Sequence, residues 1–271
     1  MSNLSYMQKA TDRGQLQIHV TTERGFFPIK DASIRLSYTG NPTEIIEELS
    51  TDISGQTAAV ELPAPPLEYS MEPSEFQPYS EYTIQVNASG YRPINISGIS
   101  VLPDKTSIQN VRMETATVEN PLERNIVITA NTLYGNFPPK IPEDEIKPMT
   151  ESGEIVLSRV VIPEYVIVHD GPPSDSSAND YYVRYRDYIK NVASSEIYAT
   201  WPDAALRANI LAIMSFTLNR VYTEWYRNKG YDFTITSSTA FDHKFVYGRN
   251  IFSNISNIVD EMFNSYLSRP N

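Results

Sequence analysis

The chain has 271 residues, no cysteine, and a net charge of −11 from 33 acidic and 22 basic side chains. A chain of this length holds about two domains, and its 41% hydrophobic content is enough for folded cores. Because phosphate polymers and anionic membrane surfaces are bound by clustered lysine and arginine, the acidic balance argues against both as partners. The lack of cysteine excludes disulfides, thiolate nucleophiles and cysteine-based metal sites.

Metal-binding and targeting signals are equally sparse. The three histidines, His19, His169 and His243, are widely spaced and form no HExxH or HxH cluster, so no metal or other cofactor is predicted. No apolar run reaches the ~18 residues that span a bilayer. The N-terminal string MSNLSYMQKATDRGQ lacks the apolar core of a secretory signal. We therefore expect no membrane span and no recognisable signal peptide.

Residues 13–115 alternate apolar and polar side chains in the manner of strands, after an N-terminal extension of residues 1–12. The clearest alternating runs are residues 16–20, 34–38 and 82–86. Short strands separated by turn signals such as Asp52-Ile53-Ser54-Gly55 predict a two-layer antiparallel β-sandwich. The strings PIKDASIRL, STDISGQTAAVELP and YTIQVNASGYRPINISGI resemble carboxypeptidase-regulatory or prealbumin-like modules. That resemblance implies a non-catalytic accessory domain.

The rest of the chain changes character twice. Residues 116–150 are rich in proline and lack periodicity, which predicts an extended connector. Residues 151–271 begin with a β-branched stretch and then switch to helical periodicity near residue 181. The expected helices end near Glu196, run over residues 203–228, and cover residues 255–267. The fold class is therefore predicted to be mixed, an all-β sandwich followed by an α+β domain of catalytic type.

The most specific pattern is YIKNVASSEIYATWPDAALRANILAIMSFTLNR, residues 188–220. It resembles the core of the stage II sporulation protein D family, whose members are lytic transglycosylases that cleave glycans. The downstream string GYDFTITSSTAFDHKFVYGRN is similar to the family's histidine followed four residues later by a tyrosine, here His243 and Tyr247. The order of sandwich, TLYGNFPPKIPEDEIKP connector and core is similar to the spore cortex-lytic enzymes, a group within this family. The resemblance implies glycan strands of spore cortex peptidoglycan as the partner, and the cortex region of the spore as the location.

Cleavage of a glycosidic bond requires a carboxylic acid of raised pKa to protonate the leaving oxygen. A lytic transglycosylase needs one such group, because the same carboxylate then accepts a proton from the sugar's own C6 hydroxyl as a 1,6-anhydro ring closes. The resemblance implies that Glu196 is this catalytic residue. Its neighbours Ala193, Ser194 and Ser195 are small and leave room for a substrate. From the pattern alone, a solvated glutamate at a helix end is the alternative.

The resemblance also implies the substrate-binding residues. Arg207 falls where the family carries a basic residue, with a solvated helix arginine as the alternative. His243 and Tyr247 are predicted to donate to sugar hydroxyls or the N-acetyl group, although a lone histidine is often structural. Trp201 is either a sugar-stacking residue or a core residue beside Pro202. At Met214 the family usually has an arginine, so one polar anchor is expected to be absent.

The resemblance further implies a precursor. The family's catalytic domain continues beyond the last helix here, so we expect this core to be truncated. We also expect a germination protease to cut the connector near Arg124, within residues 117–127, because proteolysis needs exposed backbone without sheet pairing. The alternative function is a non-catalytic glycan-binding or spore-structural protein. A metallo-hydrolase is disfavoured by the missing ligand cluster.

Overall fold

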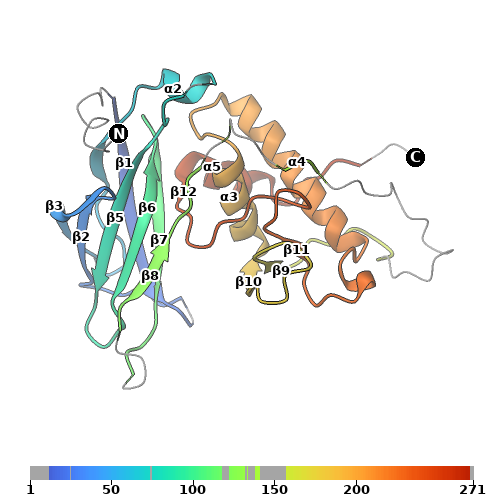
Figure 1. Ribbon diagram of the computed structural model, residues 1–271, viewed down its shortest axis with the longest axis horizontal. Helices are drawn as coiled ribbons and strands as arrows, with labels where there is room; N and C mark the ends of the chain where they lie inside the picture. The colour runs from blue at the N-terminus through green and yellow to red at the C-terminus, as the bar shows by residue number, and fades with distance from the viewer. Residues whose placement is uncertain are drawn as a thin grey trace. The chain divides into compact units, whose positions relative to one another are not determined.

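The computed structural model describes residues 12–24, 26–73, 75–117, 122–131, 133, 138–140 and 157–268. The chain forms two compact units, shown in Figure 1. The first unit comprises Met1–Tyr134, Tyr198–Trp201 and Tyr247–Asn254, and the second comprises Gly135–Ile197, Pro202–Val246 and Ile255–Asn271. Two short stretches from the C-terminal half of the chain therefore belong to the first unit.

Within its described residues, the first unit is built from two β-sheets. One sheet has the strand order β12-β7-β1-β4, with β1 Asp12–Thr22, β4 Val60–Ala64, β7 Thr106–Met113 and β12 Ile251–Phe252. The other has the order β3-β2-β5-β6-β8, with β2 Ser33–Tyr38, β3 Asn41–Ser50, β5 Ser80–Asn87, β6 Ile94–Val101 and β8 Arg124–Val127. The predicted β-rich N-terminal part is confirmed: the one helix there that the described residues contain is α2, Glu68–Met71.

The alternating pattern explains the core of the first unit. Successive side chains of a strand point to opposite faces, so apolar residues two apart line the same face. The buried members of this core include Leu16, Ile18, Val20, Ile34, Leu36, Ile84 and Val86. Each such side chain contributes about 1.5–3 kcal/mol when it is removed from water. Strand periodicity therefore predicted most of the inward-facing residues of this unit, with the half-buried Tyr38 as an exception.

The pairing directions differ from the antiparallel expectation. β1 pairs with β7 in parallel over eight residue pairs, from Gln15↔Thr106 to Thr22↔Met113, and β6 also pairs with β8 in parallel. Parallel neighbours need a long connection, and the chain supplies one because β2 to β6 intervene between β1 and β7. The expectation of a wholly antiparallel sandwich is therefore wrong for these two pairs.

Residues 247–254 add to the first unit from far along the chain. β12 pairs with β7 through Ile251↔Ile108 and Phe252↔Ser107. Next to it, the buried Asn250 amide accepts from the Ser100 N–H at 3.1 Å and donates to the Ser100 carbonyl at 3.0 Å. Gly248 adopts φ +81°, and a Cβ at this position would lie 2.7 Å from the Ile126 Cγ2 atom. Glycine is therefore required where this segment enters the unit.

The predicted cleavage position, Arg124, lies in β8. Arg124 is its first residue, and β8 pairs with β6 from Ile94↔Arg124 to Ser97↔Val127. The Arg124 backbone N–H also donates to the Pro93 carbonyl at 2.9 Å. The expectation that Arg124 lies in backbone without sheet pairing is therefore wrong. Residues 118–121 of the predicted stretch lie outside the described residues.

The second unit combines a small sheet with helices. The sheet has the order β10-β9-β11, with β9 Tyr165–His169, β10 Asp180–Arg184 and β11 Ile235–Thr236. The helices are α3 Tyr185–Glu196, α4 Asp203–Tyr222 and the 3₁₀ turn η1 Arg227–Lys229, and α5 Ser253–Met262 starts in the last residues of the first unit. In the described part of the chain, none of the helices has the length and apolar character needed to cross a bilayer.

Two helices are shorter than the periodicity predicted. α4 ends at Tyr222 instead of near residue 228, because Glu224 adopts φ 48° and the N–H of Trp225 turns back to the Arg220 carbonyl. Gly230 still ends a helical segment in the left-handed conformation, as expected, but that segment is η1. α5 ends at Met262, and Tyr266 and Leu267 beyond it are exposed.

Candidate active site

Glu196 is the last residue of α3, and its helix is anchored by the apolar face that the sequence predicted. Tyr188, Ile189 and Val192 are fully buried, whereas Glu196 is only partly buried. Ile197 is already extended, so the chain leaves the helix directly after Glu196. Because the C-terminal end of a helix carries partial negative charge, an ionised carboxylate is disfavoured there.

The segment of residues 241–246 packs against this end of α3. The Lys244 backbone N–H donates to Glu196 Oε1 at 2.7 Å. The Asn191 side chain binds Val246 twice, accepting from its N–H at 3.0 Å and donating to its carbonyl at 2.8 Å. These three bonds hold residues 244–246 in register with the last turn and a half of α3, so the Glu196 carboxyl has a fixed position.

Burial raises the pKa of Glu196 above its ordinary value, and the Lys244 N–H and the positive charges of Lys140 and Lys244 oppose that shift in part. A raised pKa keeps more of the carboxyl protonated near neutral pH. Glu196 therefore has the property that a general acid requires, as the sequence analysis expected.

His243 directly precedes Lys244 in the segment that binds Glu196, and it is almost fully buried. Its Nδ1 atom is 3.3 Å from the Tyr188 hydroxyl, and its ring centroid is 4.7 Å from that of Phe216. Burial lowers the pKa of His243 to about 3, so the imidazole is neutral at physiological pH. In that state it is a hydrogen-bonding group, not a source of positive charge.

One residue of the proline-rich connector also reaches this site. The Lys140 ammonium donates to the Asp242 carbonyl at 2.5 Å and lies 5.8 Å from the Phe216 ring centroid. Its positive charge lowers the pKa values of both Glu196 and His243. Lys140 was not among the residues expected from the sequence.

A buried ion pair holds the turn that carries His243. Arg220 of α4 bonds Asp242 through Nε and Oδ1 at 2.7 Å, and the two side chains are 1% and 0% exposed. The other carboxylate oxygen, Oδ2, accepts from the Tyr226 hydroxyl at 2.6 Å and from the N–H and hydroxyl of Thr236 at 2.8 and 2.7 Å. The Asp242 carboxylate is thus occupied by four donors, and it ties the turn to both α4 and β11.

Arg207 has carboxylate partners of its own. Its guanidinium bonds Asp203 through Nε and Glu261 through Nη2, each at 2.7 Å, on the surface of the second unit. The structure thus joins Arg207 to α5 and to its own helix, and it records no bond from Arg207 to Glu196. Met214, which stands where the resembled family usually has arginine, is fully buried.

Tyr247 and Trp201 belong to the first unit. The Tyr247 hydroxyl accepts a hydrogen bond from Arg124 Nη2. The Trp201 indole N–H donates to the Ser70 carbonyl at 2.9 Å, and its ring meets Tyr198 edge-on at 6.2 Å. Both side chains thus have structural partners, and their assignment as glycan contacts stays a prediction.

One site residue that was not predicted, Arg220, has a recognisable signal in the sequence. Arg220 follows Ile210, Ile213 and Thr217 at a helical spacing of three or four, which places a charge on the buried face. A charge in that position requires a partner, and Asp242 is that partner. Asn191 and Lys140 gave no such signal, because their bonds depend on segments far away in the sequence.

A family model described as stage II sporulation protein (SpoIID) matches residues 178–261. This is a family of sporulation lytic transglycosylases, and the match contains Glu196, His243, Arg220 and Asp242. The role of that family is sporulation-associated peptidoglycan degradation. No curated protein sequence matches the chain.

Three solved structures show partial similarity. The Bacillus anthracis TIE protein is 17% identical with a TM-score of 0.27, over 39% of this chain and 17% of that one. A minor pilin of Streptococcus agalactiae is 13% identical with a TM-score of 0.28, over 40% of this chain and 46% of that one. Klebsiella pneumoniae 5-hydroxyisourate hydrolase is 17% identical with a TM-score of 0.24, over 37% of this chain and 86% of that one. The chain thus spans less than half of the first two proteins.

Proposed function

We propose that the chain is the precursor of a lytic transglycosylase that degrades spore cortex peptidoglycan during germination. Glu196 is the single general acid and base, and the products carry 1,6-anhydromuramyl ends. The family match over residues 178–261 supports the reaction class. The position of the Glu196 carboxyl supports the choice of catalytic group, because it is held by one backbone N–H at a helix end.

The observation that carries this proposal is that, among the described residues, the segment bound to Glu196 brings it no second usable carboxylate. Glycosidases that use water need two carboxyl groups, one as acid and one as base or nucleophile. Residues 241–246, the segment that binds Glu196, contain one acidic residue, Asp242. Its carboxylate oxygens already accept hydrogen bonds from Arg220, Tyr226 and Thr236. A carboxylate with four donors is a poor base or nucleophile. The site therefore favours a reaction that needs one carboxyl group.

The reaction balances with Glu196 alone. Its carboxylic acid donates a proton to the glycosidic oxygen as the bond from C1 to that oxygen breaks. The resulting carboxylate accepts the proton of the C6 hydroxyl on the same sugar while O6 bonds to C1. The anhydro ring closes, no water is consumed, and Glu196 regains its proton for the next cycle.

The test is mass spectrometry of soluble products from purified spore peptidoglycan. We expect anhydromuramyl fragments from the wild-type chain and none from Glu196→Gln, while the exposed Glu164→Gln control in the same unit keeps wild-type yields. Reducing ends, which hydrolysis by water would produce, instead of anhydro ends would contradict the reaction class. Glycan binding without products from any variant would favour the non-catalytic glycan-binding or structural function.

The proposal includes activation by a germination protease that cuts near Arg124. In this structure a cut after Arg124 requires β8 to detach from β6, because the two strands pair there. Arg124 is also bonded to Glu114 at 2.8 Å. We expect germinating-spore extract to produce a fragment that starts near this position, and intact mass measurement identifies it. Full activity of the uncut chain would contradict the precursor role.

A further inference from the structure

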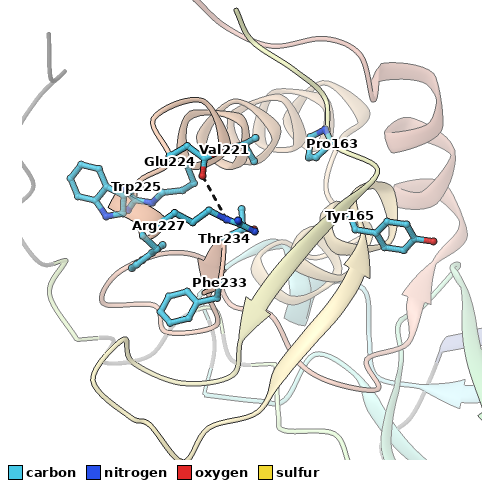
Figure 2. A pocket seen from close by; sticks show the side chains of 10 residues that line it. Pro163, Tyr165, Val221, Glu224, Trp225, Arg227, Phe233 and Thr234 are labelled. Carbon is cyan, nitrogen blue, oxygen red and sulfur yellow. Dashed lines mark ion pairs between the residues drawn. The ribbon is translucent and has the colours of Figure 1, made fainter. Parts of the chain in front are cut away.

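The second unit contains a pocket that the proposed reaction does not use. It has a volume of about 290 Å³, and its lining residues are Pro163, Tyr165, Arg220, Val221, Glu224, Trp225, Tyr226, Arg227, Phe233 and Thr234. It lies between the C-terminal end of α4 and the edge of the sheet near β9 and β11, as Figure 2 shows. This volume is near the lower end of the range for small-molecule sites, about 300 Å³.

The pocket holds a matched pair of opposite charges. Arg227 Nε lies 3.6 Å from Glu224 Oε2, and the two side chains are 55% and 25% exposed. Figure 2 shows the Arg227 guanidinium extending between α4 and the strands, with Glu224 above it. A free anion would be repelled by Glu224 and a free cation by Arg227. A neutral hydroxylated ring can accept from the guanidinium and donate to the carboxylate at the same time.

The remaining walls suit the apolar face of such a ring. Pro163 and Val221 line the pocket beside the charged pair, and Phe233 forms its lower side in Figure 2. Carbon–hydrogen faces of a sugar are apolar, whereas its edge carries hydroxyl groups. An apolar wall with a few convergent polar groups is the usual composition of a small-ligand site.

The backbone that presents Glu224 is itself unusual. Glu224 adopts φ 48°, a left-handed conformation that costs a residue with a Cβ atom about 1 kcal/mol or more. This turn ends α4 early and holds Glu224 within reach of Arg227, which lies in η1. Strained backbone is found preferentially at functional sites, so the turn and the charged pair both indicate a function for this pocket.

From these observations we propose that this pocket binds a neutral sugar unit, as a subsite separate from Glu196. Arg220 connects the two places, because it lines the pocket and also pairs with Asp242, the residue before His243. That the sugar belongs to peptidoglycan rests on the proposed function. The preference for an uncharged sugar rests on the pocket alone.

The experiment measures binding of the uncharged tetramer of N-acetylglucosamine to the full chain carrying Glu196→Gln, which prevents turnover. The readout is the indole N–H signal of Trp225, a pocket residue and one of two tryptophans in the chain. We expect saturable shifts of this signal. Glu224→Gln and Arg227→Gln should each weaken binding by at least about tenfold, since a hydrogen bond to a charged group contributes about 1.5–3 kcal/mol and 1.4 kcal/mol is tenfold.

The matched control is Arg186→Gln, which breaks an exposed pair with Asp260 that has the same N–O distance, 3.6 Å, in the same unit. It should leave affinity unchanged, and raising the salt concentration from about 0.05 to 0.5 M should change affinity less than about twofold. Equal affinity in all three variants, or no shift of Trp225, would overturn the proposal. Tighter binding of glucuronate than of the tetramer, strengthened by Glu224→Gln, would also overturn it. Cleavage by the wild-type chain is scored separately, so failure of the reaction leaves this result interpretable.

Discussion

Replacing Asp242 by asparagine should destabilise the second unit strongly. The change leaves the Arg220 guanidinium without a counter-charge at a position where both side chains are at most 1% exposed. Removing one partner of such a buried pair typically costs about 3–5 kcal/mol. That is a large part of the stability of a domain, which is about 5–15 kcal/mol. Arg220→Met should cost a similar amount, because it leaves the buried Asp242 carboxylate without a counter-charge.

The double variant separates the ion pair from the rest of the site. With Arg220→Met and Asp242→Asn together, no uncompensated charge remains. We therefore expect the double variant to lose at least about 2 kcal/mol less than the sum of the two single changes. Phe216, Trp225 and Tyr226 surround the guanidinium at 4.6, 4.7 and 5.7 Å from their ring centroids, so the methionine has apolar neighbours.

The assay is urea unfolding followed by tryptophan fluorescence in a Trp201→Phe background. The chain has two tryptophans, so this background makes Trp225, beside Arg220, the sole reporter, and it observes the second unit. A control background without further changes sets the reference. The reasoning is refuted if either single variant loses less than about 1 kcal/mol, or if the two losses add within about 0.5 kcal/mol.

Three other effects follow from the structure. Burial lowers the pKa of His243 from 6.5 to about 3, so the stability that comes from its neutral form is fully present above pH 6.5 and is lost as pH falls toward 3. Urea titrations should show that the free energy of unfolding of the wild type falls over this pH range by up to about 5 kcal/mol more than that of His243→Gln. Lys140→Met removes a charge that lowers the pKa of Glu196, so the high-pH limb of kcat/KM should move to higher pH, and an unmoved limb would contradict the contact. Asn250→Ala removes the acceptor of the buried Ser100 N–H and one of the two donors to the Ser100 carbonyl, which keeps the Ser107 hydroxyl. It should cost about 1–3 kcal/mol, whereas Arg207→Gln breaks exposed pairs and should cost under about 1 kcal/mol. Thermal unfolding of the two variants gives the comparison.

Glu196 shows how far the candidate site could be predicted. Its place at the end of a helix with a buried apolar face follows from local spacing, because Tyr188, Ile189 and Val192 repeat along one side. Its bond to the Lys244 N–H spans 48 residues of sequence. The hydrogen bonds between the Asn191 side chain and the Val246 backbone span 55 residues. No local pattern encodes which backbone group meets a side chain at that separation.

The sandwich shows the same division. Alternation at residues 16–20, 34–38 and 82–86 determined by itself that these segments are strands whose apolar side chains face the core, because the two faces of a strand alternate with each residue. The burial of Ser37 and Thr83 and the partial exposure of Tyr38 depart from that alternation. The parallel pairing of β1 with β7, and the addition of β12 from residues 251–252, were decided only by the tertiary structure. Strand pairing joins backbone groups that are the same in every residue, so the sequence of one strand does not specify its neighbour. The partner is selected by the burial of side chains when the whole unit closes.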